Sequence, residues 1–234
     1  MLGFFGGVMK GIFALISFFS FAFADLRKPD ERLFEVKILS ISPEIYFIEN
    51  FFSLDDCDHL KKKAMPHLKR STVVDETGHT NGVVHQARTS SGMFFSPFMQ
   101  DPVVTLLEEK IARLTNTPKK NGEWIQVMRY QPLEEYLPHY DFFDPNTSGG
   151  RDTLLRGGQR IATCILYLEE PQKGGETIFP YMMISVSPKK GGLLLFYNCN
   201  EKNEVDLLTF HGSAPVIEGE KWIATRWIRQ NTFR

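Results

Sequence analysis

The sequence changes character near Trp124, and this change limits the possible folds more than any other feature. Upstream lie two segments with helical periodicity, and downstream lie seven short β-rich runs separated by turn residues. The runs span 124–130, 136–142, 160–168, 176–179, 192–198, 206–211 and 221–229. Because helices precede a continuous series of strands, the order predicts an α+β chain with a double-stranded β-helix (jelly-roll) core and supporting N-terminal helices.

The upstream segment carries start signals for both helices. Ser53 stands at a helix N-cap, and Asp101 followed by a proline opens the second helix. Apolar side chains then recur at helical spacing, at Leu54, Cys57, Leu60 and Ala64 and at Val104, Leu107, Ile111 and Leu114. With a strand expected at 45–48, we predict that residues 25–120 support a core formed by residues 121–234.

The N-terminus, residues 1–24, reads as a signal peptide or a signal anchor. Residues 11–23 are almost wholly apolar, follow Lys10, and run into the small-x-small sequence Ala22-Phe23-Ala24. The apolar run is short for a bilayer span of about 20 residues, although counting back to Met1 lengthens it. Either reading predicts delivery to the secretory pathway, in the endoplasmic reticulum lumen or outside the cell.

Composition argues against two classes of function. The formal net charge is −1 and no long basic run occurs, so a protein that coats nucleic acid is not expected. The three cysteines, Cys57, Cys164 and Cys199, match no metal-ligand spacing and could form at most one disulfide. A disulfide-stabilised scaffold and a cysteine-bound zinc site are therefore both disfavoured.

A long polar segment interrupts the β-rich half of the chain. Residues 144–159 are rich in glycine and polar side chains, and the segment is too long for a hairpin turn. Loops of this length in compact domains are usually lids or disordered segments. We therefore expect a loop at 144–159 that lies outside the sheet.

Two residues in one predicted strand have the spacing of metal ligands. His139 and Asp141 are two positions apart, so an extended strand directs both side chains to the same face. His211, near the last hairpin, would supply a third ligand. Two histidines and one carboxylate leave three positions of an octahedron open, which is the arrangement of non-heme Fe(II) oxygenases. A His-x-Asp pair alone is a weak signal and is more often ordinary surface polarity.

Lys221 opens the last apolar run, ten residues after His211. A lysine at the head of a buried strand is costly unless an anion meets it, and the distal carboxylate of 2-oxoglutarate would be such an anion. Alternatively, Lys221 ends the turn at Glu218-Gly219-Glu220 and extends its ammonium to water. Sequence spacing alone does not favour either interpretation of Lys221, the anion-binding one or the solvent-exposed one.

Short motifs spread along the chain carry a family resemblance. They are RTSSGMF at 88–94, YQPLEEYLPHYD at 130–141, RIAT at 160–163, GGET at 174–177, PKKG at 188–191, HG at 211–212 and the stretch 215–222. Taken in this order, from about Ile45 to Arg229, they resemble the prolyl 4-hydroxylases of the collagen, plant, algal and viral group. Any one motif would be weak, but the ordered set is specific.

The resemblance implies roles for individual residues. His139, Asp141 and His211 would bind Fe(II), and Lys221 would pair with the distal carboxylate of 2-oxoglutarate. The remaining residues expected in the co-substrate pocket are Tyr130, Thr163, Tyr167, Thr225 and Trp227.

Further implied roles concern catalysis and the peptide. Tyr136 would lie close to iron and substrate, and Arg160 would contact the peptide from a different wall of the site than Thr163. The segment at 88–94 and the loop at 144–159 would be mobile elements that close over the peptide. Where the family often has a histidine, this chain has Arg229, and we assign it no role.

The implied activity is hydroxylation of peptidyl proline at C4, dependent on Fe(II), O₂ and 2-oxoglutarate, with succinate as a product and ascorbate as a further cofactor. The expected substrate is a proline-rich or collagen-like peptide, and a membrane is expected only if residues 1–24 are an uncleaved anchor. Two alternatives stay open. One is a lysyl hydroxylase or other peptide oxygenase, although lysyl hydroxylases generally use arginine where this chain has Lys221. The other is a jelly-roll binding module that holds zinc or no metal.

Overall fold

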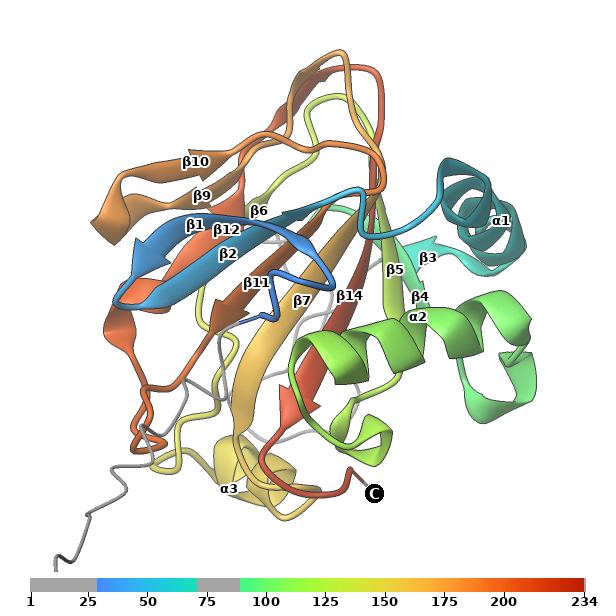
Figure 1. Ribbon diagram of the computed structural model, residues 1–234. Helices are drawn as coiled ribbons and strands as arrows, with labels where there is room; N and C mark the ends of the chain where they lie inside the picture. The colour runs from blue at the N-terminus through green and yellow to red at the C-terminus, as the bar shows by residue number, and fades with distance from the viewer. Residues whose placement is uncertain (1–28, 71–88, 234) are drawn as a thin grey trace, which may run out of the picture.

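The computed structural model describes residues 29–70 and 89–233. Within them, two antiparallel sheets lie face to face, and helices cover the outside of the larger sheet (Figure 1). The predicted α+β jelly roll is confirmed. The expected targeting segment 1–24 and Arg88 of the first motif lie outside the described residues. In the described part of the chain, no helix is long and apolar enough to cross a membrane.

The larger sheet has eight strands in the order β1-β2-β11-β7-β14-β5-β4-β3. The two longest strands, β7 and β14, pair with each other near its middle. The strands are β1 (Glu35–Ile41), β2 (Glu44–Glu49), β3 (Lys69–Arg70), β4 (Ser91–Phe94), β5 (Gln126–Tyr130), β7 (Arg160–Glu169), β11 (Leu193–Tyr197) and β14 (Lys221–Arg229).

The smaller sheet has four strands in the order β10-β9-β12-β6. Its inner strands pair so that residues far apart in sequence become neighbours. The strands are β6 (Tyr136–His139), β9 (Thr177–Phe179), β10 (Ile184–Val186) and β12 (His211–Ser213), and a separate ribbon joins β8 (Lys173–Gly174) to β13 (Val216–Glu218).

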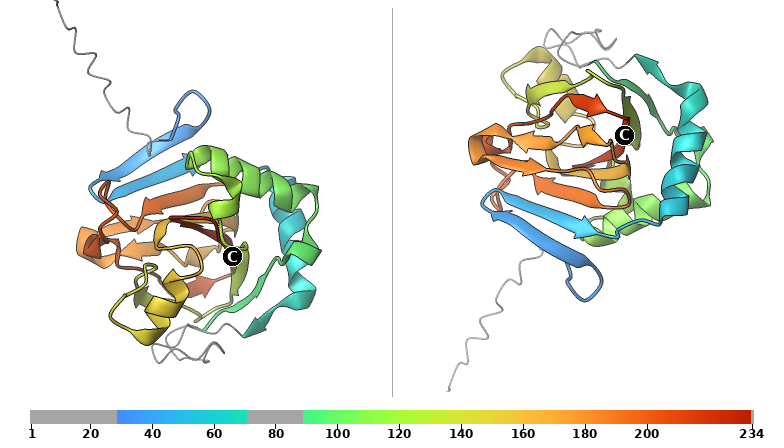
Figure 2. Two further views of the ribbon diagram at one scale, coloured as in Figure 1. Left: turned by 90° about the horizontal axis from the view of Figure 1, so that it is seen from below. Right: turned by 90° about the horizontal axis from the view of Figure 1, so that it is seen from above.

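Two helices, α1 (Leu54–Ala64) and α2 (Pro102–Leu114), pack on the outer side of the larger sheet (Figure 2). Both begin where the sequence predicts. Ser53 Oγ accepts a hydrogen bond from Asp56 N at 3.1 Å, and Asp101 Oδ1 accepts one from Val104 N at 2.8 Å. Each cap satisfies a backbone donor that the first turn of a helix leaves free.

Alternation along the central strands sorts their side chains between two apolar clusters. On β7, Ala162, Cys164, Leu166 and Leu168 belong to the outer cluster beneath the helices, whereas Ile165 and Tyr167 belong to the cluster between the sheets. On β14, Trp222 and Ala224 face outward and Ile223 faces inward. Ile165 and Tyr167 on β7 and Ile223 on β14 therefore point into the space between the sheets.

Two predictions about local structure are wrong. The segment 144–159 contains a helix, α3 (Ser148–Leu154), whose N-cap Thr147 accepts a hydrogen bond from Gly150 N at 3.0 Å. Residues 206–211 do not form one strand, because Leu207–Thr209 is a 3₁₀ turn and β12 begins only at His211. The α3 segment is short and glycine-rich, so periodicity could not reveal it. Its polar capping residues are equally common in loops.

Leu195→Ala tests the outer cluster. Leu195 is fully buried at the middle of β11, so its truncation leaves a cavity and should lower the free energy of unfolding by about 2–5 kcal/mol. Urea denaturation measures the change. Leu155, which is 87% exposed, offers a matched leucine, and Leu155→Ala should stay within about 0.5 kcal/mol of the parent. Equal effects of the two changes would contradict the assignment of the core.

Candidate metal centre

Strand pairing brings the three predicted metal ligands together. His139 ends β6 and His211 begins β12, and the two residues are partners in the register of that pair. Asp141 follows two residues after His139. One ligand atom from each of the three side chains lies within 4.8 Å of the other two. Asp141 Oδ1 is 3.6 Å from His139 Nε2, and Asp141 Oδ2 is 3.6 Å from His211 Nε2.

The two imidazoles present their Nε2 atoms to the centre. Nδ1 of His139 lies 3.0 Å from the carbonyl oxygen of Leu137, and Nδ1 of His211 lies 2.9 Å from that of Thr209. A carbonyl oxygen can only accept, so each Nδ1 is the donor and each Nε2 is the ring nitrogen available to a metal. Both histidines are therefore set to bind a cation through Nε2.

Electrostatics keep the centre in a metal-binding protonation state. Burial lowers the pKa of His211 to about 4, so its imidazole is neutral near pH 7. Burial by itself raises the pKa of Asp141, but His211 and His139 outweigh it and hold that pKa well below the usual range. One carboxylate and two imidazole nitrogens form the donor set that suits Fe(II) and leaves three octahedral positions open. The donor chemistry of the site thus fits the metal implied by the sequence.

Asp141 is held by a chain of buried side chains. Thr163 Oγ1 donates to Asp141 Oδ2 at 2.7 Å, and Asn198 Nδ2 donates to Thr163 Oγ1 at 2.9 Å. Thr163 faces the interior as expected, but its hydroxyl contacts the metal ligand. Sequence reasoning missed Asn198, which carries no motif signal and follows β11.

Lys221 is buried, which contradicts the reading that its ammonium extends to water. The residue is 1% exposed, and its Nζ donates to Ser213 Oγ at 2.8 Å. The Nζ atom also lies 5.3 Å and 5.9 Å from the ring centroids of Tyr130 and Tyr167. Burial lowers the pKa of Lys221 to about 7, and the charge of Glu176 opposes part of that shift. A buried amine with so little compensation suits an anion that arrives with a ligand.

Other predicted pocket residues share this interior. Thr225 and Trp227 lie at odd positions of β14, like Lys221, and both are buried. Thr225 Oγ1 and Trp227 Nε1 have no hydrogen-bond partner, which typically costs about 1–3 kcal/mol per buried group. Tyr167 OH lies 2.8 Å from Oγ1 of Thr177, a buried residue on β9 that sequence reasoning missed. The partnerless polar atoms suit a polar ligand between the sheets.

Tyr136 and Arg160 lie at the edge of the same site. The Tyr136 ring stacks on His139 with centroids 3.7 Å apart. Arg160 forms a bidentate pair with Glu123, through Nε at 2.7 Å and Nη2 at 2.9 Å, and its guanidinium lies 3.9 Å above the Trp227 ring. Arg160 is thus fixed within the protein, on a wall formed by Glu123 and Trp227.

Arg229, to which the sequence assigns no role, is part of this wall. It is 1% exposed and donates to Glu123 Oε1 at 2.9 Å and to the carbonyl oxygen of Thr153 at 2.5 Å. Glu123 therefore lies between two guanidinium groups, which hold its pKa below the usual range although burial raises it. Because Thr153 belongs to α3, Arg229 also ties that helix to the end of β14.

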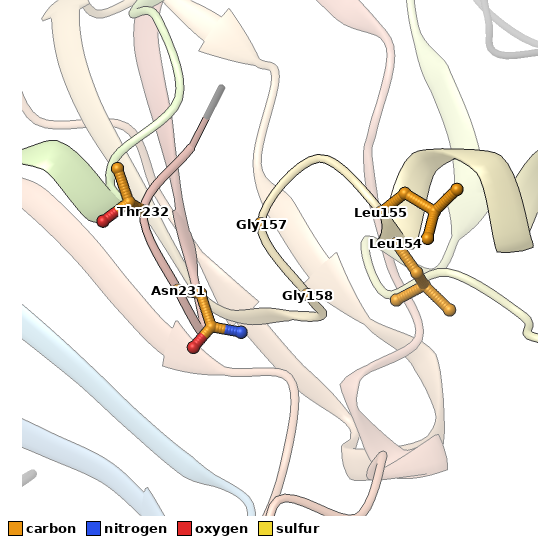
Figure 3. A pocket seen from close by; sticks show the side chains of 6 residues that line it. All are labelled: Leu154, Leu155, Gly157, Gly158, Asn231 and Thr232. Carbon is orange, nitrogen blue, oxygen red and sulfur yellow. The ribbon is translucent and has the colours of Figure 1, made fainter.

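A surface pocket near α3 is separate from the predicted site residues. It has a volume of about 340 Å³ and lies between the end of α3 and the C-terminal residues (Figure 3). The side chains and backbone that line it belong to Leu154, Leu155, Gly157, Gly158, Asn231 and Thr232. None of these groups is a strong acid, base or nucleophile.

Comparison with known proteins agrees with this geometry. A family model described as the 2OG-Fe(II) oxygenase superfamily matches residues 125–229. Prolyl 4-hydroxylase 1 of Arabidopsis thaliana is 40% identical over 209 residues, which cover 83% of this chain and 71% of that protein. Probable prolyl 4-hydroxylase 6 of the same plant is 38% identical over 240 residues, with 95% and 78% covered.

A solved structure shows the same likeness in three dimensions. The viral collagen prolyl hydroxylase of Paramecium Bursaria Chlorella virus-1, in its 2OG complex, superimposes with a TM-score of 0.61 at 29% identity. The match covers 79% of this chain and 95% of that one. The 40% identity to the plant relative spans most of both proteins. Together with the buried His-Asp-His centre, it shows that this chain belongs to the prolyl 4-hydroxylase family of 2OG-Fe(II) oxygenases.

Proposed function

We propose that the protein hydroxylates peptidyl proline at C4, using Fe(II), O₂ and 2-oxoglutarate, and releases succinate and CO₂. The observation that carries this proposal is the combination of a buried His-Asp-His centre with a buried lysine in one interior. Either feature alone also occurs in proteins that perform no oxidation. Together they provide one site for a cation and one for the far end of a dianion.

The protein's own residues bind and orient the reactants. His139, Asp141 and His211 would hold the iron, which together with 2-oxoglutarate and O₂ supplies the oxidation that inserts one oxygen atom into a C–H bond. Lys221 would bind the distal carboxylate, which places the 2-oxo-acid end of the co-substrate toward the metal ligands. Thr225 Oγ1 lies on the same face of β14 and has no hydrogen-bond partner, and we assign it to the same carboxylate.

The substrate side of the site favours a peptide with planar, apolar rings. Tyr136 stacks on His139 and the Trp227 ring lies against Arg160, and proline packs well against aromatic surfaces. Arg160, held by Glu123, adds a donor group beside Trp227. The named activities of the plant and viral relatives support a proline-rich or collagen-like peptide as the substrate.

Two features argue against the alternative functions. A binding module without chemistry would gain nothing from a buried lysine whose charge is disfavoured in the empty interior. A lysyl hydroxylase would be expected to have arginine at position 221. No described residue favours either alternative over hydroxylation of proline.

Two further expectations complete the proposal. Ascorbate would sustain turnover by keeping the iron reduced. The apolar run and the small-x-small sequence before Asp25 would direct the enzyme to the secretory pathway. A mature chain that begins at Met1 on membranes would instead identify an anchor.

The proposed activity predicts coupled products. Wild-type protein incubated with Fe(II), 2-oxoglutarate, ascorbate and a proline-rich peptide should form succinate and 4-hydroxyproline in equal amounts, measured by mass spectrometry. His139→Ala, Asp141→Ala and His211→Ala should each abolish both products and weaken binding of Fe(II), because each change removes one of the three ligands that the described residues would offer the ion. Succinate formation with a lysine-containing peptide and none with proline peptides would contradict the substrate assignment.

Lys221→Ala should raise the 2-oxoglutarate requirement far more than the iron requirement. Loss of one partner of a buried charge pair typically costs about 3–5 kcal/mol, or about two to four orders of magnitude in affinity. Titration of 2-oxoglutarate at saturating iron and peptide measures the change. Lys189→Ala, at a lysine whose side chain is 56% exposed, is the matched control and should leave the titration unchanged. A shift below about threefold for Lys221→Ala would remove the proposed anchor.

The lowered pKa of Lys221 predicts a pH dependence. With a pKa of about 7 before the dianion binds, the amine is charged below that pH and largely neutral above it. Binding requires the ammonium, so affinity for 2-oxoglutarate should fall as pH rises above about 7, by up to about tenfold per unit. Anaerobic titration at several pH values measures this fall. Lys221→Arg stays charged and should bind more weakly but without the fall, and a parallel slope in both proteins would contradict this cause.

A further inference from the structure

The carboxylate of Asp141 depends on side chains for its orientation. Asp141 lies beyond His139, the last residue of β6, so no strand pairing fixes its position. Its Oδ2 accepts the 2.7 Å hydrogen bond from Thr163, whose Oγ1 accepts the 2.9 Å bond from Asn198. Thr163 and Asn198 are both fully buried, and Asp141 is 5% exposed. These three hydrogen-bonded side chains therefore lie out of reach of bulk water.

The available protons allow the two hydrogen bonds to run in only one direction, from Asn198 through Thr163 to Asp141. Thr163 Oγ1 donates to Asp141 Oδ2 at 2.7 Å, so the single hydroxyl proton of Thr163 points to that oxygen. The Thr163 oxygen then has lone pairs to offer, and the amide nitrogen of Asn198 donates to one of them. If the Asn198 amide turned over, its oxygen would compete with Asp141 for the Thr163 proton. The orientation of Asn198 thus determines whether Asp141 receives its hydrogen bond.

Backbone hydrogen bonds beside the larger sheet hold Asn198, the first donor of the hydrogen-bond series, in place. Asn198 follows β11, its backbone N–H donates to Ile161 O at 2.9 Å, and its carbonyl accepts from Asp206 N at 2.9 Å. Asn198 Oδ1 is buried without a partner, whereas Nδ2 donates to Thr163 Oγ1. Thr163 lies within β7, opposite Phe196 and Trp227. Two side chains from the larger sheet therefore restrain a ligand that follows a strand of the smaller one.

We infer that Thr163 and Asn198 are positioning residues that make Asp141 bind the metal through one oxygen, Oδ1. The inference rests on the metal centre of the proposed function and goes beyond it. The Thr163 hydroxyl stabilises charge on Oδ2, and Oδ1 is left as the free donor beside His139. A carboxylate bound through both oxygens would occupy a fourth of the six octahedral positions. The remaining two would not accommodate a chelating 2-oxo acid together with O₂.

Metal titration of the protein without co-substrate or peptide tests the inference. Thr163→Val keeps the side-chain shape but removes the hydroxyl, and it should weaken anaerobic Fe(II) binding about 10- to 100-fold. Asn198→Leu should produce a loss of the same kind, and Thr163→Ser, which keeps the hydroxyl, should bind within about threefold of wild type. Because the two residues act as one chain, the double variant should lose little more than either single variant.

A second measurement separates coordination from stability. Bound Mn(II) relaxes the protons of exchanging water, and the effect reports on the number of open coordination positions. Wild type and Thr163→Ser should give equal relaxation, whereas Thr163→Val should give less, because Asp141 is then free to bind through both oxygens. Thr115→Val removes another buried hydroxyl, bonded to Ile111 O at 2.9 Å on α2, and should change melting temperature without changing either metal measurement.

The outcomes distinguish this inference from the proposed function. If folded Thr163→Val or Asn198→Leu binds Fe(II) within about threefold of wild type, or if their losses simply add, the positioning role is wrong and the enzyme assignment stands. Unchanged water relaxation in Thr163→Val would likewise overturn the claim that Asp141 is held to one oxygen. Wild-type protein that binds neither Fe(II) nor Mn(II) would remove the proposed function as well.

Discussion

Charge buried between two sheets is the constraint on which the rest of this structure depends. Apolar burial can hold the sheets together, but a carboxylate and an amine in that interior need compensation. Asp141 receives it from two histidines and Thr163, whereas Lys221 receives it from Ser213, two aromatic rings and the charge of Glu176. The compensation is thus nearly complete on the metal side and incomplete on the lysine side. This asymmetry fits a site that holds its metal in advance and takes its dianion with each turnover.

The two-residue alternation of side chains along a strand places polar groups between the sheets while apolar groups pack beneath the helices. On β14 the same alternation that buries Trp222 beneath the helices directs Lys221 and Thr225 between the sheets. Pairing of β6 with β12 then sets His139 beside His211. The helices contribute no ligand. Their role is to cover the outer face, so that both faces of the central strands are dry and the interior charges stay unscreened.

Much of the fold and of the centre could be predicted because the signals are local. Helix caps at Ser53 and Asp101 act within one turn, and the i, i+2 spacing of His139 and Asp141 acts within one strand. The resemblance to the family favoured a co-substrate role for Lys221 and predicted the other pocket residues. Predictions failed where local composition was ambiguous, as in 144–159, where capping and loop formation use the same polar residues and glycines.

The sequence by itself therefore determined the fold class, the three candidate metal ligands and the lysine proposed to bind the co-substrate. Tertiary structure alone decided what those residues touch. Asn198 reaches Asp141 through Thr163, and Arg229 joins Glu123 to α3, across separations in the chain that no periodicity links. The physical reason is that a hydrogen bond depends on distances and angles of a few ångströms and degrees. These distances and angles are set only when sheets and helices have packed. The alternation of side chains along a strand, by contrast, can be read from a few consecutive residues.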